Sequence, residues 1–208
     1  MGMIPRFPIL ALGALLGVAL AVPAWAQEPG DRQWVHPPVN LPPAERGEHS
    51  YNLDTLFGAL KIAPDDASAK AIEQRIWATW MVSGSDTCTL LMSRVKAAAD
   101  GKDYDLAIKL LNAIIEIKPD YIEAWNQRAT VYYMMNDYGR SLADIREVLA
   151  REPRHFGALS GLGLILQDIG DDKHALEAYR KALAIDPHLE HLPDVVKTLS
   201  EKVEGRDI

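Results

Sequence analysis

Apolar residues recur every three or four positions from residue 51 onward, a spacing that predicts helices. The first stripe consists of Leu53, Leu56, Phe57 and Leu60, and the second of Ala69, Ile72, Ile76 and Trp80. Pro64 separates the two stripes, Asp65 and Asp66 can cap the second helix, and Gly84 is expected to end it. Residues 51–84 are therefore predicted to form a helical hairpin.

The rest of the pattern repeats when the chain is shifted by 34 positions against itself. Residues that align three times include the sets Asp103, Asp137, Asp171; Val95, Ala129, Gly163; Leu111, Ile145, Tyr179; Leu91, Trp125, Leu159; and Pro119, Pro153, Pro187. The aspartates can cap a helix after a turn, and the prolines cannot continue the helix that they follow. The small residues allow two helix backbones to approach closely. Each unit is therefore predicted to be a pair of packed helices.

These positions resemble the tetratricopeptide repeat (TPR), a helix-turn-helix unit that stacks into a superhelix. The second copy carries the family's Trp125, Ala129, Tyr132 and Pro153, and the third carries Leu162, Gly163, Leu166, Ala175, Tyr179, Ala182 and Pro187. The resemblance implies an all-α, right-handed TPR solenoid with units at 88–121, 122–155 and 156–189. The hairpin at 51–84 would cap its front. Residues 190–208 would form a C-terminal capping helix, with Val195, Val196, Leu199 and Val203 on one side, and a frayed tail.

The first 26 residues are typical of a signal peptide. Arg6 precedes an apolar run, and Ala24-Trp25-Ala26 precedes the expected cleavage point before Gln27. The alternative is an uncleaved anchor, but the run is shorter than the roughly 20 residues of a spanning helix. The sequence therefore predicts a periplasmic protein with no stable membrane span after cleavage, similar to exported bacterial TPR proteins.

Residues 27–50 form a Pro-rich linker, because their prolines favour an extended backbone without donors. Trp34 and Val35 are the bulky apolar residues of this linker, and they either dock on the helical body or remain solvated.

The net charge and the candidate reactive residues limit the functions that the sequence allows. Lys and Arg total 22 against 29 Asp and Glu, a net charge of −7 that disfavours nucleic acid. Cys88 is the single cysteine, and His188 and His191 lack further ligands, so neither a metal nor a cofactor is expected. We expect a non-enzymatic scaffold. The alternatives are an accessory subunit or weak hydrolase of the cell envelope using His155, His174 or Cys88, and a self-assembling homo-oligomer.

The expected binding surface is the concave groove, which would hold a peptide or an envelope protein. Its predicted lining is Met92, Lys96, Glu123, Asn126, Thr130, Tyr133, Met134, Ser160, Leu164 and Gln167. Arg94 and Arg128 occupy one repeat position where the family usually places leucine. They either pack their stems between helices or form a small ladder that binds a partner's carboxylate or phosphate. The family's carboxylate clamp of Lys and Asn is matched only at scattered positions.

Overall fold

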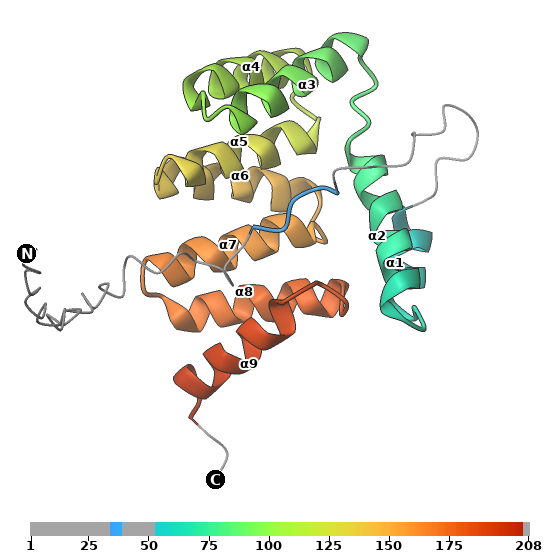
Figure 1. The fold of residues 1–208 in the computed structure, drawn as a ribbon, viewed down its shortest axis with the longest axis vertical. Helices are drawn as coiled ribbons and strands as arrows, with labels where there is room; N and C mark the ends of the chain where they lie inside the picture. Colours follow the sequence, from blue (N-terminus) through green and yellow to red (C-terminus); the bar gives the residue numbers. More distant parts are fainter. Residues whose placement is uncertain (1–33, 39–52, 206–208) are drawn as a thin grey trace, which may run out of the picture. The chain divides into compact units, whose positions relative to one another are not determined.

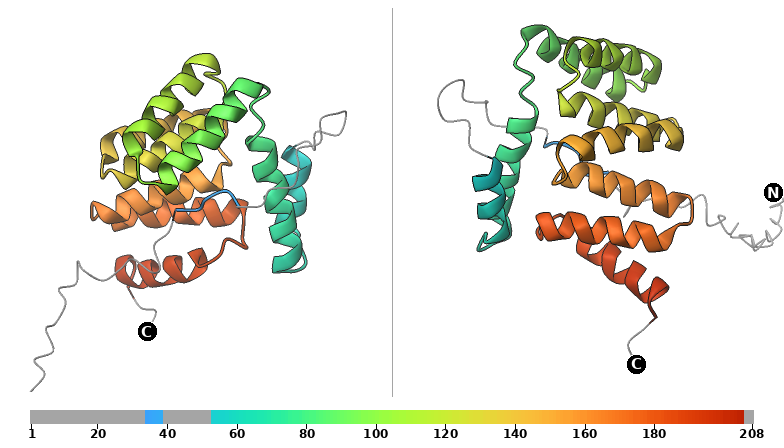
Figure 2. Two further views of the ribbon diagram at one scale, coloured as in Figure 1. Left: turned by 45° about the horizontal axis from the view of Figure 1, so that its top comes forward. Right: turned by 180° about the vertical axis from the view of Figure 1, so that it is seen from behind.

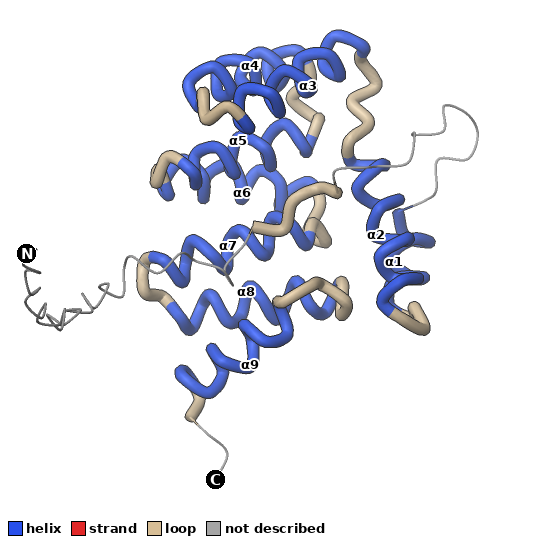
Figure 3. Tube along the Cα trace, in the orientation of Figure 1, coloured by secondary structure: helices blue, strands red, loops and turns tan. Residues whose placement is uncertain are grey.

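The computed structural model describes residues 34–38 and 53–205. The predicted signal peptide, most of the linker and the end of the tail lie outside the described residues. Within the described ranges the chain forms nine α-helices and no strand (Figures 1 and 3). The helices are α1 Leu53–Lys61, α2 Asp66–Trp80, α3 Asp86–Asp100, α4 Tyr104–Ile117, α5 Ile122–Met134, α6 Tyr138–Arg151, α7 Phe156–Asp168, α8 Asp172–Ile185 and α9 Leu192–Val203.

The six helices α3 to α8 form three antiparallel pairs that stack in chain order (Figure 1). Helices α4, α6 and α8 begin at residues 104, 138 and 172, so each follows its predecessor by one repeat. The three predicted caps are present, because Asp103, Asp137 and Asp171 each accept a hydrogen bond from the backbone N–H three residues later. The predicted TPR solenoid is therefore confirmed.

Each pair is packed by a small residue on the first helix and a larger one on the second. The combinations are Val95 with Leu111, Ala129 with Ile145, and Gly163 with Tyr179. A Cβ atom on Gly163 would lie 2.4 Å from the Tyr179 ring. The smallest residue thus faces the largest partner, which keeps the three helix pairs similar although the sequence changes.

Helix α9 closes the far end of the stack by packing on α8, as predicted. Leu192 and Leu199 are buried in the same core cluster as α8, and Val195, Val196 and Val203 pack against it. Arg180 on α8 also forms an ion pair with Glu204 just after α9. The apolar face of the last repeat is therefore covered.

The hairpin α1–α2 does not cap the front of the stack. It packs beside α7 and α8 instead (Figures 1 and 2). Trp77 and Trp80 contact the Phe156 ring at the start of α7, and Asp54 and Asp66 bind Arg154 and His188. The expectation that residues 51–84 cover the first unit is therefore wrong, since their apolar stripe is buried against the third.

Within the described part of the chain, no helix pair precedes the first unit to cover its front as each later unit is covered by its predecessor. Leu90 on α3 is 57% exposed, whereas Ala124 and Ala158, at the same position of α5 and α7, are fully buried.

None of the described helices is long and apolar enough to span a membrane.

Candidate functional site

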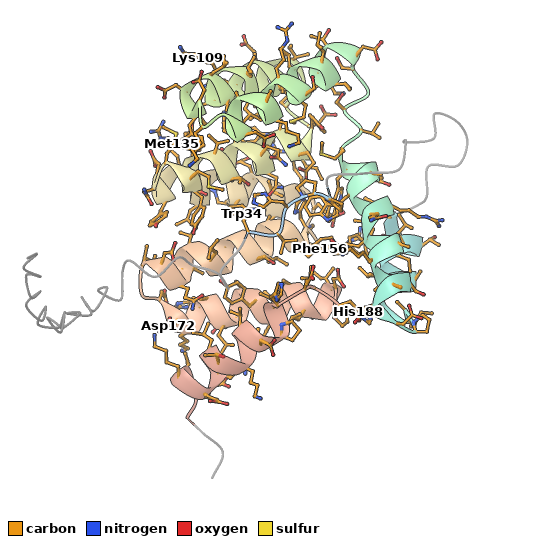
Figure 4. All side chains as sticks on the ribbon, in the orientation of Figure 1. Trp34, Lys109, Met135, Phe156, Asp172 and His188 are labelled. Atoms are coloured by element: carbon orange, nitrogen blue, oxygen red, sulfur yellow. The ribbon has the colours of Figure 1, made fainter. Side chains whose placement is uncertain are left out.

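The first helices of the three pairs, α3, α5 and α7, present one side that we call the inner face. It carries Gly157 and Gly161 on α7, Asn126 and Tyr133 on α5, and their counterparts on α3. The segment 34–38, here called the Trp34 segment, runs in an extended form along this face (Figures 1 and 4). Trp34 is only 3% exposed. Part of the inner face is therefore covered by the protein's own chain.

A glycine makes room for the indole of Trp34. A Cβ atom on Gly161 would lie 2.4 to 2.6 Å from three carbon atoms of the Trp34 ring. Tyr133 lies on another side, with its ring centroid 5.6 Å from that of Trp34. The Tyr133 hydroxyl donates a hydrogen bond to Asp168, which fixes the position of this ring. The indole therefore lies against bare backbone on α7 and an oriented aromatic ring on α5.

A second glycine admits the neighbouring elements. A Cβ atom on Gly157 would lie 2.7 Å from the Trp77 ring and 3.2 Å from the carbonyl oxygen of Val35. Gly157 and Gly161 are one helical turn apart, so the hairpin and the Trp34 segment reach α7 along one side. The glycines allow a close approach that any side chain would block.

Beside this contact lies a buried polar network. The backbone N–H of Ala158 donates to Nδ1 of His155, so the ring proton is on Nε2. That Nε2 donates to Glu123 at 2.7 Å, and both side chains are fully buried. The His155 ring also stacks on Trp80 with centroids 4.1 Å apart. Glu123 and His155 therefore join the second unit, the third unit and the hairpin.

The predicted groove residues divide into a covered and an accessible group. Covered residues are Met92, Glu123, Asn126, Thr130, Ser160 and Leu164. Partly or largely accessible residues are Lys96, Tyr133, Met134 and Gln167. Thr130 and Ser160 donate to backbone carbonyls of their own helices, and Lys96 pairs with Asp100. Leu164 belongs to the cluster that contains Trp34, so it is a core residue rather than a surface contact.

The two arginines of the predicted ladder differ in environment. Arg128 makes a bidentate pair with Asp144 at 2.7 and 2.8 Å and donates to Asn112 at 2.7 Å. Its hydrogen bonds to Asp144 raise its pKa. Arg94 is exposed on the first unit, where Leu110 occupies the position equivalent to Asp144. Arg128 therefore joins α4, α5 and α6, which matches the structural reading of this residue.

The residues of the hydrolase alternative have separate structural partners. Cys88 is buried in the core of the first unit, His155 holds Glu123, and His174 binds the capping residue Asp171. In the part of the chain that the structure describes, no group of three or more His, Cys, Asp or Glu side chains could hold a metal ion.

The groove prediction omitted the residues that define the covered surface. Trp34 and Trp77 are its bulky elements, and Gly157 and Gly161 provide the space for them. The available signal was a pair of glycines one turn apart on the inner side of a helix. Glycine lowers the stability of a helix, so its presence there indicates that another group approaches the backbone closely. Trp34, a large aromatic among prolines, was the matching signal.

Comparisons with known proteins agree with this architecture. A tetratricopeptide repeat family model matches residues 126–190. A TPR repeat-containing protein of Rhizobium etli is 42% identical over 153 residues, which cover 74% of this chain and 75% of that protein. Small glutamine-rich tetratricopeptide repeat-containing protein 2 of Saccharomyces cerevisiae is 27% identical over 146 residues, but this chain spans only 36% of its length.

Solved structures show the same fold. The Sgt2 TPR domain from Aspergillus fumigatus superposes with a TM-score of 0.54 at 26% identity, covering 60% of this chain and 83% of that one. The first TPR of Spaghetti, bound to an HSP90 peptide, has a TM-score of 0.54 at 17% identity, covering 58% and 95%. Together with the repeat spacing, the capping aspartates and the Rhizobium relative, these similarities establish that the chain belongs to the tetratricopeptide repeat family.

Proposed function

We propose that this protein is a non-enzymatic periplasmic scaffold that binds a peptide segment or another envelope protein on its inner face. Stacked repeats of this class form extended concave binding surfaces. The observation that carries the proposal is that the inner face of α5 and α7 already holds an extended segment, with Trp34 almost completely buried. A surface that accommodates one extended segment has the shape that peptide recognition requires.

The polar groups support binding rather than catalysis. The buried pair Glu123 and His155 lies in the packed core, with His155 stacked on Trp80 and also accepting a backbone hydrogen bond. A catalytic base must reach the proton that it removes, and this imidazole has both nitrogens engaged within the protein.

A site-specific cross-linking experiment tests the scaffold function. A benzophenone amino acid is placed at Ser93, exposed on the inner side of α3, and in a second variant at Lys109, exposed on α4 (Figure 4). Illumination in envelope extract should give a discrete adduct with position 93 and none with position 109. Equal labelling at both positions, or no adduct at either, would count against a binding role for the accessible part of the inner face on α3.

The proposed location has an independent test. Export with removal of residues 1–26 predicts that the natural protein begins at Gln27 and is released with the periplasmic fraction. Intact-mass measurement of the purified protein checks this. A species that retains residues 1–26 and requires detergent for extraction would contradict it.

Self-association is a second candidate function, favoured by the uncovered front of the first unit. Leu90 is exposed at the position where Ala124 and Ala158 are buried by stacking, so a second copy could cover this surface. Leu90→Glu should then abolish a concentration-dependent dimer in sedimentation equilibrium. Ile62→Glu, at a residue that is 81% exposed just after α1, should leave it unchanged. A wild-type protein that stays monomeric at high concentration would exclude this candidate.

A further inference from the structure

We infer that the inner face around Gly161 and Tyr133 is a recognition site for an extended peptide that presents a tryptophan, and that the Trp34 segment is its built-in competitor. This inference rests on the proposed scaffold function and names the class of partner. The Trp34 segment is the occupant that the structure shows, and its chemistry defines what the site accepts.

The first element of the site is its shape. Because a Cβ atom on Gly161 would lie only 2.4 Å from the Trp34 ring, the ring rests on the α7 backbone itself, which forms the floor of the site. The Tyr133 ring, tilted by 48° to the indole, forms a side wall. A flat, wide aromatic group fits between a bare helix backbone and a fixed ring, and burying it removes a large apolar area from water. The site therefore selects an aromatic side chain.

The second element is the backbone that follows the indole. The Val35 carbonyl lies against the bare backbone at Gly157, and Pro37 and Pro38 are half-buried in an extended conformation. Prolines have no N–H to leave unsatisfied, and they fix an extended geometry before binding. The geometry thus favours a partner segment in which a tryptophan is followed by an apolar residue, one exposed residue and two prolines.

The third element is the location of the site. At the same repeat positions of the first unit, Ser93 and Thr89 replace Gly161 and Gly157, and both are exposed. A serine or threonine Cβ occupies the space that the indole needs on α7. The tryptophan site is therefore confined to the second and third units, and α3 provides a matched control surface.

The contact has a feature that allows displacement. The Trp34 Nε1–H is buried and has no hydrogen-bond partner within the described residues. A buried donor without an acceptor weakens the contact that contains it. Attachment through the chain compensates, because it gives the segment a high effective concentration at the site. A free partner must therefore compete with a tethered but imperfectly satisfied occupant.

The test uses the full chain carrying Trp34→Gly and a fluorescent peptide with the sequence of residues 30–40. Removing the indole from the protein should expose the site, so fluorescence anisotropy should show the peptide binding at least about tenfold more tightly to the variant than to the wild-type protein. A peptide carrying Trp34→Ala should show at least about tenfold weaker binding to the variant. Equal binding of the two peptides, or equal binding to the two proteins, would overturn the inference.

Two further variants locate the binding. In the Trp34→Gly background, Gly161→Leu should abolish peptide binding, whereas Ser93→Leu at the matched position of α3 should leave it unchanged. Circular dichroism verifies that each variant is folded. The peptide should raise the melting temperature of the Trp34→Gly protein and of its Ser93→Leu derivative, but not that of the Gly161→Leu derivative. Binding that survives Gly161→Leu would overturn the assigned site. A wild-type dimer that dissociates when peptide is added would show that the segment comes from a second copy and would overturn the intramolecular contact.

The peptide experiment and the cross-linking experiment fail independently. An adduct at Ser93 together with no peptide binding to the Trp34→Gly protein would leave the scaffold function standing and remove the tryptophan site. Tight, Gly161-dependent peptide binding without any adduct at position 93 would retain the tryptophan site and remove the wider scaffold surface on α3.

Discussion

Helices α3 and α7 occupy the same position in two repeats, yet only α7 is covered on its inner side. Positions 157, 161 and 164 of α7 carry Gly, Gly and Leu, and all three are buried. The equivalent positions of α3 carry Thr89, Ser93 and Lys96, and all three are exposed. The repeat thus fixes where a residue lies, while its identity decides whether other parts of the chain can cover it.

This difference divides the inner face into a covered part and an accessible part. The covered part binds the hairpin and the Trp34 segment, and it has the dense packing of a core. The accessible part on α3 is polar, with Lys96 paired to Asp100. The two parts should therefore respond differently to mutation. Changes on the inner side of α7 should lower stability and release chain segments, whereas changes on the inner side of α3 should alter only binding at the surface.

The largest effect is expected from Trp77→Ala on the covered side. Trp77 is fully buried and packs edge-on against Phe156 with centroids 5.3 Å apart. Its removal leaves a large cavity between the hairpin and α7, so the free energy of unfolding should fall by about 3–5 kcal/mol. Thr89→Ala on α3 should change it by less than about 0.5 kcal/mol. Urea denaturation measures both values, and similar losses would contradict the comparison.

A smaller loss is expected from Gly163→Leu on the opposite side of α7. The new side chain would collide with the Tyr179 ring, which lies 2.4 Å from the Cβ position, and overpacking should cost about 2–3 kcal/mol. Val95→Leu in α3 faces the smaller Leu111 and should cost less than half as much. Thermal unfolding distinguishes them, and an unchanged melting temperature for Gly163→Leu would show that the pairing with Tyr179 is absent.

Gly161→Leu should lower the free energy of unfolding by a smaller amount, about 1–2 kcal/mol. The leucine displaces Trp34 and exposes its apolar surface, but replacing a helical glycine also offsets about 1 kcal/mol of that loss. Limited proteolysis should then cleave the chain near residue 34 faster than in the wild type. Ser93→Leu should leave the cleavage rate unchanged, and equal rates in both variants would mean that Gly161 does not contact the segment.

The smallest effect is a gain in stability at neutral pH from Asp186→Asn. Burial raises the pKa of Asp186 and also that of Glu73, which the charge of Asp186 raises further. At these two carboxyl groups the folded chain therefore holds protons that the unfolded chain has lost, so their contribution to stability falls as the pH rises above about 4. The Asp186→Asn substitution removes the buried charge and retains the local hydrogen bond, because an amide oxygen can still accept from the backbone N–H of His188.

Melting temperatures between pH 4 and pH 7 test this expectation. The melting temperature of Asp186→Asn relative to that of the wild type should increase as the pH rises, because the variant lacks the buried carboxyl group. Glu152→Gln at the equivalent position of the second unit should instead destabilise the protein, because Glu152 pairs with Arg154. An unchanged slope for Asp186→Asn would show that this carboxyl group does not titrate abnormally.

The solenoid could be predicted from the sequence because its determinants are local and repeated. The aspartates at 103, 137 and 171 each cap a helix by accepting a hydrogen bond from the backbone N–H three residues later. Gly163 and Tyr179 lie at fixed positions of one helix pair. Because the same pattern occurs in three copies, each copy supports the assignment of the other two. The helix pairs, their caps and the final helix α9 follow directly from such short-range signals.

The cover of the inner face could not be predicted in the same way. The stripe with Leu56, Phe57 and Leu60 shows that the hairpin needs an apolar partner, but it fits the front of the first unit as readily as the side of the third. The place where the hairpin and the Trp34 segment pack depends on the contacts of Trp77 with Gly157 and of Trp34 with Gly161. These residues are far apart in sequence, and each contact occurs in one copy of the repeat. Leu164, which was predicted as part of an open groove, is covered for this reason.

The most direct test of the covered inner face is a nuclear Overhauser measurement on the wild-type protein. The Trp34 ring signals can be assigned by their loss in Trp34→Phe. The structure predicts cross-peaks between the Trp34 ring protons and the α-protons of Gly161, together with contacts to the Tyr133 ring. Trp34 signals at the shifts of a free indole, with no cross-peak to Gly161, would contradict the account.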